Sequence, residues 1–139
     1  METPLLDALN DAAIRAYETH DAARPVGLRH LGAVLSLHGI SLNGGLVGGG
    51  VENLFFDDRL DTLDDAVDGF RWLGLDDAAD LVVRAREAYL RFRPTGYEEL
   101  SDADAELWDE LDREFFATAG QERLEAAVAR RQTEIVPAG

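Results

Sequence analysis

The chain has 139 residues, of which 46% are hydrophobic, and it carries a formal net charge of −15. This apolar content is sufficient for a buried core, so it excludes intrinsic disorder and predicts a single domain over residues 1–139. Cysteine and lysine are both absent, which excludes disulfides, cysteine-ligated metals, a P-loop lysine and Schiff-base chemistry. An acidic surface repels nucleic acid and anionic lipid and attracts basic proteins, so we expect no direct nucleic-acid or membrane binding.

Two segments bear on location. The N-terminus, Met1 to Pro4, lacks the basic region and apolar run of a signal peptide. The longest apolar stretch, residues 31–42, is too short to span a bilayer. We therefore expect a cytoplasmic protein.

Apolar residues at helical spacing predict an all-α fold, a compact bundle of about six helices with a glycine-rich loop after the second helix. The second expected helix is apolar over much of its circumference, which is typical of a central helix. Five glycines between residues 44 and 50 predict that no helix forms there. The expected helices cover residues 4–20, 26–40, 61–74, 76–94, 101–120 and 121–133, and a short apolar turn covers residues 51–56.

Polar residues and helix breakers predict where several helices begin and end. Asp61 and Asp76 are expected to act as N-caps, and Gly74 is expected to end the helix that Asp61 begins. Ser101 and Asp104 resemble a capping box with aspartate in place of the usual glutamate.

The excess negative charge lies in two blocks. Residues 57–80 carry nine aspartates and two arginines, and residues 98–114 carry nine acids and one arginine. Between them, residues 81–97 carry four arginines and one acid. High-salt adaptation or a GC-rich genome is the alternative explanation for acidic, lysine-free composition, but it predicts acids spread evenly over the surface.

The second block forms an acidic row on its predicted helix. At about 100° per residue, an apolar stripe through Trp108, Leu111 and Phe115 lies opposite an acidic arc. Like charges four residues apart cost about 0.2–0.5 kcal/mol per pair, and an ordinary solvated helix would intersperse basic residues. The row repeats about every 6 Å along the axis, roughly two phosphate steps of one DNA strand. We therefore assign partner binding to Asp102, Glu106, Asp109, Glu110 and Glu114.

The first block has an ordinary explanation for part of its charge. Carboxylates are favoured at helix N-termini, where free N–H groups and the macrodipole attract them. That accounts for Asp61, Asp64, Asp65, Asp76 and Asp77 but not for Asp57, Asp58, Asp68 and Asp80. Asp57, Asp58 and Asp68 are therefore further candidates for partner binding.

Other patterns indicate no enzyme site. The glycines at 44–50 lack the ending of a P-loop, and no spacing of His20, His30 and His38 matches a metal motif. We expect no cofactor and no metal. The remaining enzymatic alternative is a carboxylate-dependent hydrolase with a divalent metal near His38 and Glu52. Phe116 lies among the acids on the helical wheel, so it is either an interface anchor or packs under the last helix.

Several motifs resemble a known family. They are Asn43-Gly44-Gly45 after a helix, Leu54-Phe55-Phe56, the helix ending in Leu73-Gly74, the Ala-rich helix after it, and Leu111-Asp112 through Phe116. Over residues 28–118 the chain resembles a bacterial all-helical domain family typified by a Neisseria DNA-mimic protein. The family usually has an aromatic residue straight after the glycines, where this chain has Leu46. The resemblance implies an all-α fold, a homodimer, and binding to a transcription factor in place of DNA.

The first hypothesis is thus a non-enzymatic acidic protein that docks on a basic partner, such as a DNA-binding protein. The alternatives are the metal-dependent hydrolase and a housekeeping domain whose acids serve solubility alone.

Overall fold

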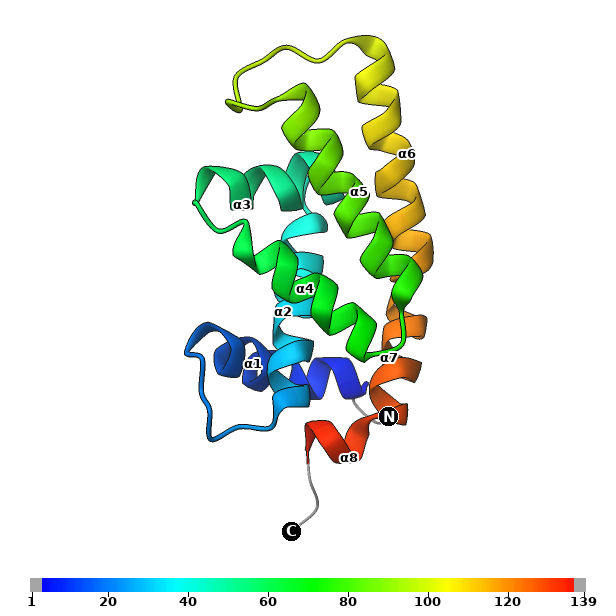
Figure 1. Cartoon of the computed structure of the whole chain (residues 1–139). Helices are drawn as coiled ribbons and strands as arrows, with labels where there is room; N and C mark the ends of the chain where they lie inside the picture. Colours follow the sequence, from blue (N-terminus) through cyan, green and yellow to red (C-terminus); the bar gives the residue numbers. More distant parts are fainter. Residues whose placement is uncertain (1–3, 137–139) are drawn as a thin grey trace.

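The computed structural model describes residues 4–136, which form eight α-helices and one π-helical segment with no strand (Figure 1). This confirms the predicted all-α class; the count exceeds six because two short helices, α3 and α8, were not expected. Residues Met1 to Thr3, on which the signal-peptide prediction depends, lie outside the described range, as do the last three residues of the predicted domain 1–139. The elements are α1 (Leu5–Glu18), α2 (Val26–Ser41), η1 (Leu46–Val51), α3 (Glu52–Phe56), α4 (Asp61–Trp72), α5 (Asp76–Phe92), α6 (Asp102–Thr118), α7 (Gln121–Arg130) and α8 (Gln132–Ile135).

Helix α2 is the centre of the fold, as its apolar circumference predicts. It packs against α1, α4, η1 and α8, and Leu31, Val34 and Leu37 are fully buried. Its contact with α1 is close enough that a Cβ on Gly32 would lie 2.0 Å from the Ala13 carbonyl oxygen. Glycine is therefore required at this crossing.

No single helix among residues 4–136 combines the length and apolar character needed to cross a membrane. Helix α2 and the segment 46–56 meet those limits only when taken together, as a pair bent by 107°.

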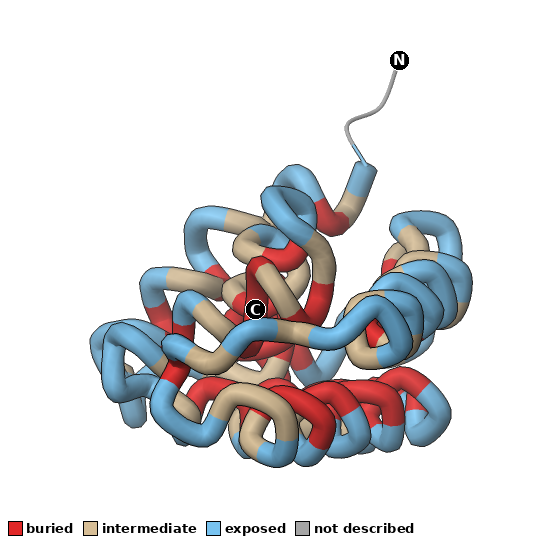
Figure 2. The backbone as a smooth tube through the Cα atoms, turned by 90° about the horizontal axis from the view of Figure 1, so that it is seen from above, coloured by how far each residue is buried: buried red, intermediate tan, exposed pale blue. Residues whose placement is uncertain are grey.

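Helices α5 and α6 lie side by side, run in opposite directions and are joined by the loop at the top of Figure 1. Aromatic rings hold the two helices together and join them to the rest of the core. Tyr89 of α5 stacks on Trp108 of α6 at 5.6 Å between ring centroids, and Phe70 of α4 meets Phe115 of α6 edge to face at 6.0 Å. Seen from above, buried residues gather between the helices and exposed ones lie on their outer sides (Figure 2).

The structure confirms one of the predicted helix caps and corrects two. Ser101 caps α6, because its hydroxyl accepts a hydrogen bond from the Asp104 N–H at 3.1 Å. The N-cap positions of α4 and α5 are Leu60 and Leu75, so Asp61 and Asp76 lie in the first turn instead. Carboxylates are also favoured in the first turn by the helix dipole, so an aspartate at a helix start does not distinguish the N-cap from the first turn.

Helix α1 has a cap that comes from elsewhere in the chain. It has no capping side chain of its own. Instead the Glu125 carboxylate of α7 accepts hydrogen bonds from the N–H groups of Leu5 and Leu6, the latter at 3.0 Å.

Helices α3 and α4 end in the same backbone motif, with one residue in the left-handed region. Gly74 ends α4 as predicted, at φ +80°. Asp58 takes the equivalent position after α3 at φ +56°, and the Arg59 N–H then bonds back to the Leu54 carbonyl at 2.8 Å. Aspartate tolerates this conformation better than most residues, which gives Asp58 a structural role.

The glycine-rich segment differs from the prediction that no helix forms there. Gly44 and Gly45, at φ +105° and +90°, do interrupt the helical conformation after α2. The next residues, Leu46–Val51, form a wide π-helical turn in which the Gly50 N–H bonds to the Gly45 carbonyl at 2.9 Å. Leu46, Val47 and Val51 are fully buried. Their packing therefore overrides the low helix propensity of the glycines between them.

Candidate functional site

The acidic face of α6 consists of Asp102, Glu106, Asp109, Glu110 and Glu114, and the structure exposes all five residues. The opposite side of the helix buries Trp108, Leu111 and Phe115. Because side chains on a helix follow its 3.6-residue period, this packing directs the five carboxylates to solvent together.

Most of this acidic face has no cationic partner within residues 4–136. Glu114 alone pairs with an arginine, Arg84 of α5, at 3.4 Å and with more than half of each side chain exposed. An exposed pair of this kind contributes little to stability, and the same holds for the similarly exposed pairs of the first block. The other four carboxylates are left to solvent in the described chain.

Arg113 also lies on the exposed side of α6, which the sequence reasoning overlooked. At about 100° per residue its angle falls between those of Asp102 and Glu106. The exposed face therefore carries five acids and one arginine. It remains strongly acidic, with its purely acidic part toward the start of the helix.

The first acidic block is arranged differently, because arginines hold four of its carboxylates. Asp64 pairs with Arg86, Asp77 pairs with Arg123 at 2.7 Å, and Arg71 pairs with Asp80 at 2.9 Å and Asp76 at 3.7 Å. The Arg123 guanidinium and the Ala78 N–H lower the pKa of Asp77.

The three candidates from that block do not form one cluster. Asp57 and Asp58 follow α3, where Asp57 is the C-cap residue, and both are exposed. Asp68 is exposed on α4 beside His30 of α2. The structure thus separates Asp68 from the pair at the end of α3.

Helix α5 lies between the two acidic helices and supplies arginines to both. Arg84 reaches Glu114 of α6, and Arg86 reaches Asp64 of α4. Two of the four arginines between the acidic blocks therefore neutralise one carboxylate each, one on either acidic helix. Along α5 the two blocks do not merge into one uninterrupted acidic surface.

The two blocks do approach each other where the end of α3 meets the loop before α6. Phe56, the last residue of α3, and Tyr97, in the loop before α6, meet with ring centroids 5.7 Å apart. Asp57 and Asp58 directly follow the first ring, and Glu98 and Glu99 directly follow the second. Sequence reasoning missed this contact because the rings are far apart along the chain.

The family motif forms a joint between η1 and α6. The Asp112 carboxylate accepts a hydrogen bond from the Val47 N–H at 3.0 Å, and a Cβ on Gly45 would lie 2.1 Å from the same carboxylate. Burial raises the pKa of Asp112, and the N–H groups of Val47 and Leu46 oppose that rise. The Asn43-Gly44-Gly45 turn and the Leu111-Asp112 segment, two parts of one sequence pattern, therefore have a common structural function. Asp112 lay at the edge of the apolar stripe, which was the signal for its burial.

The residues of the metal alternative have other partners. Glu52 pairs with Arg93 at 2.7 Å, and His38 packs against the rings of Phe115 and Phe116, each at 6.0 Å between centroids. Burial lowers the pKa of His38. Residues 4–136 hold no group of three or more His, Asp or Glu residues placed to bind a metal ion. Phe116 of α6 is half-buried and its ring lies against His38 of α2; the two predicted roles, interface anchor or packing under the last helix, stay predictions.

A cavity of about 270 Å³ lies among α1, α2 and α4 and was not anticipated. The Tyr17 hydroxyl donates to Asp65 at 2.6 Å on its wall, and burial together with this carboxylate raises the pKa of Tyr17 to about 12. His30, stacked on Trp72, has its pKa lowered by burial. The lining mixes both charges, so it favours no single class of ligand.

These observations define an acidic helical-bundle protein that presents one highly charged helix to solvent. A family model described as DMP19-like protein matches residues 22–132, so the chain belongs to the DMP19-like protein family. The match includes both sides of the Gly45–Asp112 joint and confirms the family resemblance seen in the sequence. No curated protein and no solved structure matches the chain.

Proposed function

We propose that this protein is a non-enzymatic binding protein that uses the acidic face of α6 to occupy a basic surface, in place of DNA, on a DNA-binding protein. One observation carries the proposal. Four of the five carboxylates on this face have no arginine partner among residues 4–136, although the chain places arginines on four acids of the first block.

Physical chemistry and family membership support this assignment. A row of like charges on one helix is unfavourable for the isolated fold and becomes favourable only beside positive charge. Counterion release then contributes to binding, as it does for DNA. The sequence family is the one whose typifying member is a DNA mimic, so the same class of partner is proposed here.

The test is competition between this protein and a labelled DNA duplex for a panel of purified helix-turn-helix regulators. We expect displacement of DNA from at least one regulator, with an affinity that falls at least about tenfold between about 50 mM and 200 mM salt. The triple variant Glu106→Gln/Glu110→Gln/Glu114→Gln is expected to bind the regulator about tenfold more weakly or worse, because charge is removed without changing side-chain size.

The matched control is Asp64→Asn/Asp77→Asn/Asp80→Asn, which removes three carboxylates that arginines already hold. It is expected to leave displacement nearly unchanged. Displacement that does not depend on salt concentration, or that is unchanged in the glutamine variant, would rule out the mimic function.

Self-association and location belong to the same proposal. A homodimer in the cytoplasm would present two acidic helices to one partner and increase avidity if both can engage. Light scattering of the full chain measures the first property. A monomer at micromolar concentration would leave a single acidic face as the docking unit.

A further inference from the structure

The fold leaves a pair of aromatic rings at the surface. Tyr97 is 83% exposed and Phe56 is 50% exposed. Every other Phe, Tyr and Trp side chain lies within the described residues and is buried or half-buried. An exposed aromatic pair is typical of an interface, because large rings bury much area on binding.

The position of these rings is held by specific contacts. Gly96, at φ +87°, lies so close to the pair that an added Cβ would be 2.5 Å from the Phe56 ring. The loop is closed by Glu98, whose carboxylate accepts hydrogen bonds from the N–H and hydroxyl of Thr95 at 3.0 and 2.6 Å. These bonds lower the pKa of Glu98. These contacts therefore fix the loop that carries the exposed ring of Tyr97.

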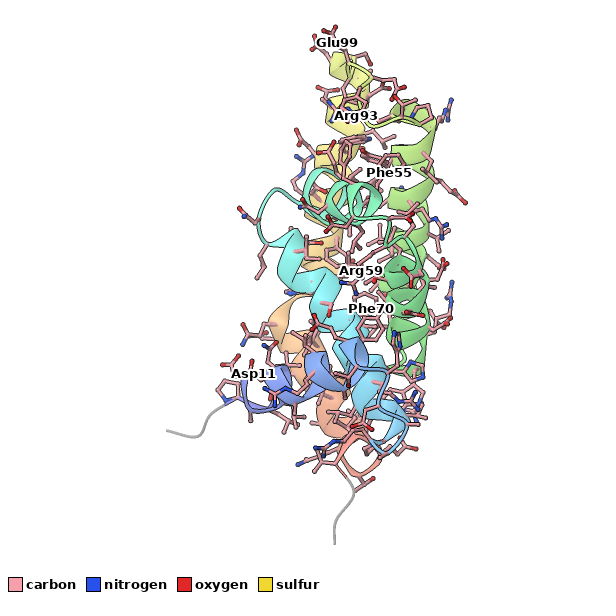
Figure 3. The ribbon with its side chains drawn as sticks, turned by 90° about the vertical axis from the view of Figure 1, so that its left-hand side faces the viewer. Asp11, Phe55, Arg59, Phe70, Arg93 and Glu99 are labelled. Atoms are coloured by element: carbon pink, nitrogen blue, oxygen red, sulfur yellow. The ribbon has the colours of Figure 1, made fainter. Side chains whose placement is uncertain are left out.

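Arg93 also holds this loop in place. Its Nε donates to the Glu98 carbonyl at 2.9 Å, and its Nη1 pairs with Glu52 of α3 at 2.7 Å. Figure 3 shows Glu99 at the upper end of the molecule, with Arg93 and then Phe55 below it. Phe55 in turn packs against Phe56 at 5.5 Å between ring centroids. The loop and α3 are thus fixed to each other.

The surroundings of the ring pair are acidic. Asp57, Asp58 and Arg59 follow one ring along the chain, and Glu98 and Glu99 follow the other, so four carboxylates and one arginine lie within three residues of the pair in sequence. An acidic or purely apolar partner would leave these carboxylates repelled or unpaired. Charge complementarity therefore selects a cationic group that also favours an aromatic surface.

The chain itself contains such an arrangement. The guanidinium of Arg93 lies 5.5 Å from the centroid of the Trp108 ring while it pairs with Glu52. Guanidinium groups stack on rings and are more weakly hydrated than the lysine ammonium. An aromatic ring beside a carboxylate is thus a combination that holds arginine in particular.

We propose that Phe56 and Tyr97 form an aromatic anchor that binds an arginine side chain of the basic partner, with the adjoining carboxylates pairing with the guanidinium. This inference rests on the proposed function and specifies the chemistry of the partner. The acidic face of α6 supplies long-range attraction, and the aromatic anchor selects arginine over lysine.

The experiment titrates the full chain with fluorescently labelled octa-arginine and octa-lysine, which have equal length and charge. We expect octa-arginine to bind about three- to tenfold more tightly than octa-lysine. Phe56→Ala/Tyr97→Ala is expected to abolish that preference and to leave octa-lysine affinity nearly unchanged. Tyr97→Phe keeps the ring and is expected to keep the preference.

Leu42→Ala is the matched control, because Leu42 is an apolar side chain that is 67% exposed outside the anchor. Circular dichroism melting of each variant establishes that the fold is retained. Equal affinity of wild type for the two peptides, or a preference that persists in the folded Phe56→Ala/Tyr97→Ala variant, would overturn the anchor.

The same assay separates this inference from the proposed function. Glu106→Gln/Glu110→Gln/Glu114→Gln should weaken both peptides equally and keep the preference for arginine. Unchanged binding of both peptides in that variant would refute the role of α6 and would leave the aromatic anchor unaffected. Loss of charge dependence and loss of arginine preference are thus independent readouts.

Discussion

One carboxylate of α4 and the three at the start of α5 pair with arginines, whereas four of the five on the acidic face of α6 have no arginine partner among residues 4–136. Asp64, Asp77 and Asp80 each contact a guanidinium from another part of the chain. Glu106 and Glu110 have no such contact among residues 4–136, although α5 lies directly beside α6. Equal acidity in the sequence therefore conceals two different arrangements, one in which arginines pair with several carboxylates and one in which most carboxylates of the described chain face solvent.

The largest expected effect comes from the joint that holds α6 in place. Gly45→Ala should lower the free energy of unfolding by about 2–4 kcal/mol, because the new Cβ would collide with Asp112 at a positive φ. Gly48→Ala is the matched control, since no atom lies within 4 Å of its added Cβ, and it should change stability by less than about 0.5 kcal/mol. Urea unfolding followed by circular dichroism measures both. Similar values for the two variants would show that the joint does not position α6.

A smaller effect of opposite sign is expected on the acidic face itself. Glu106→Gln/Glu110→Gln removes all three like-charged pairs of the row and leaves the Glu114–Arg84 pair intact. Stability should rise by about 0.6–1.5 kcal/mol at low salt. The matched change Asp64→Asn removes a carboxylate that Arg86 holds, so it should lower stability. If both changes shifted the thermal midpoint in the same direction, the distinction between the two regions would fail.

The smallest effect is a difference in pH dependence. The pKa of Asp112 is raised above its usual 3.8 by burial, so the folded state holds this proton more tightly than the unfolded state. Its contribution to stability is therefore greatest at low pH and declines as pH rises through that raised pKa. Asp77 behaves oppositely, since its lowered pKa contributes stability above the usual value that is lost as pH falls.

Asp112→Asn separates these contributions, because the amide oxygen can still accept from Val47. The stability of wild type relative to this variant should fall as pH increases from about 4 to 7. Asp77→Asn is the control: the stability of wild type relative to this variant should fall as pH decreases below about 4, because the pKa of Asp77 is lowered from 3.8. Urea midpoints across pH measure both; a constant gap between wild type and Asp112→Asn would contradict the burial of this carboxylate.

Much of the architecture follows from local patterns. The spacing of apolar residues predicted six of the eight α-helices, and Ser101 and Gly74 were recognised as the residues that begin α6 and end α4. Asp61 and Asp76 were misplaced by one position, because a carboxylate is favourable both at a cap and in a first turn. The π-helical turn could not be foreseen, since burial of Leu46 and Val47 outweighs the glycines around them.

The sequence by itself determined the all-α class and the acidic row of α6, because the helical period alone places residues three and four apart on one face. Tertiary structure decided which carboxylates find arginines, that Glu125 caps α1, that Asp112 is drawn into the joint, and that Phe56 meets Tyr97. Those outcomes join residues distant along the chain. They depend on how the helices pack against one another, which no local pattern encodes.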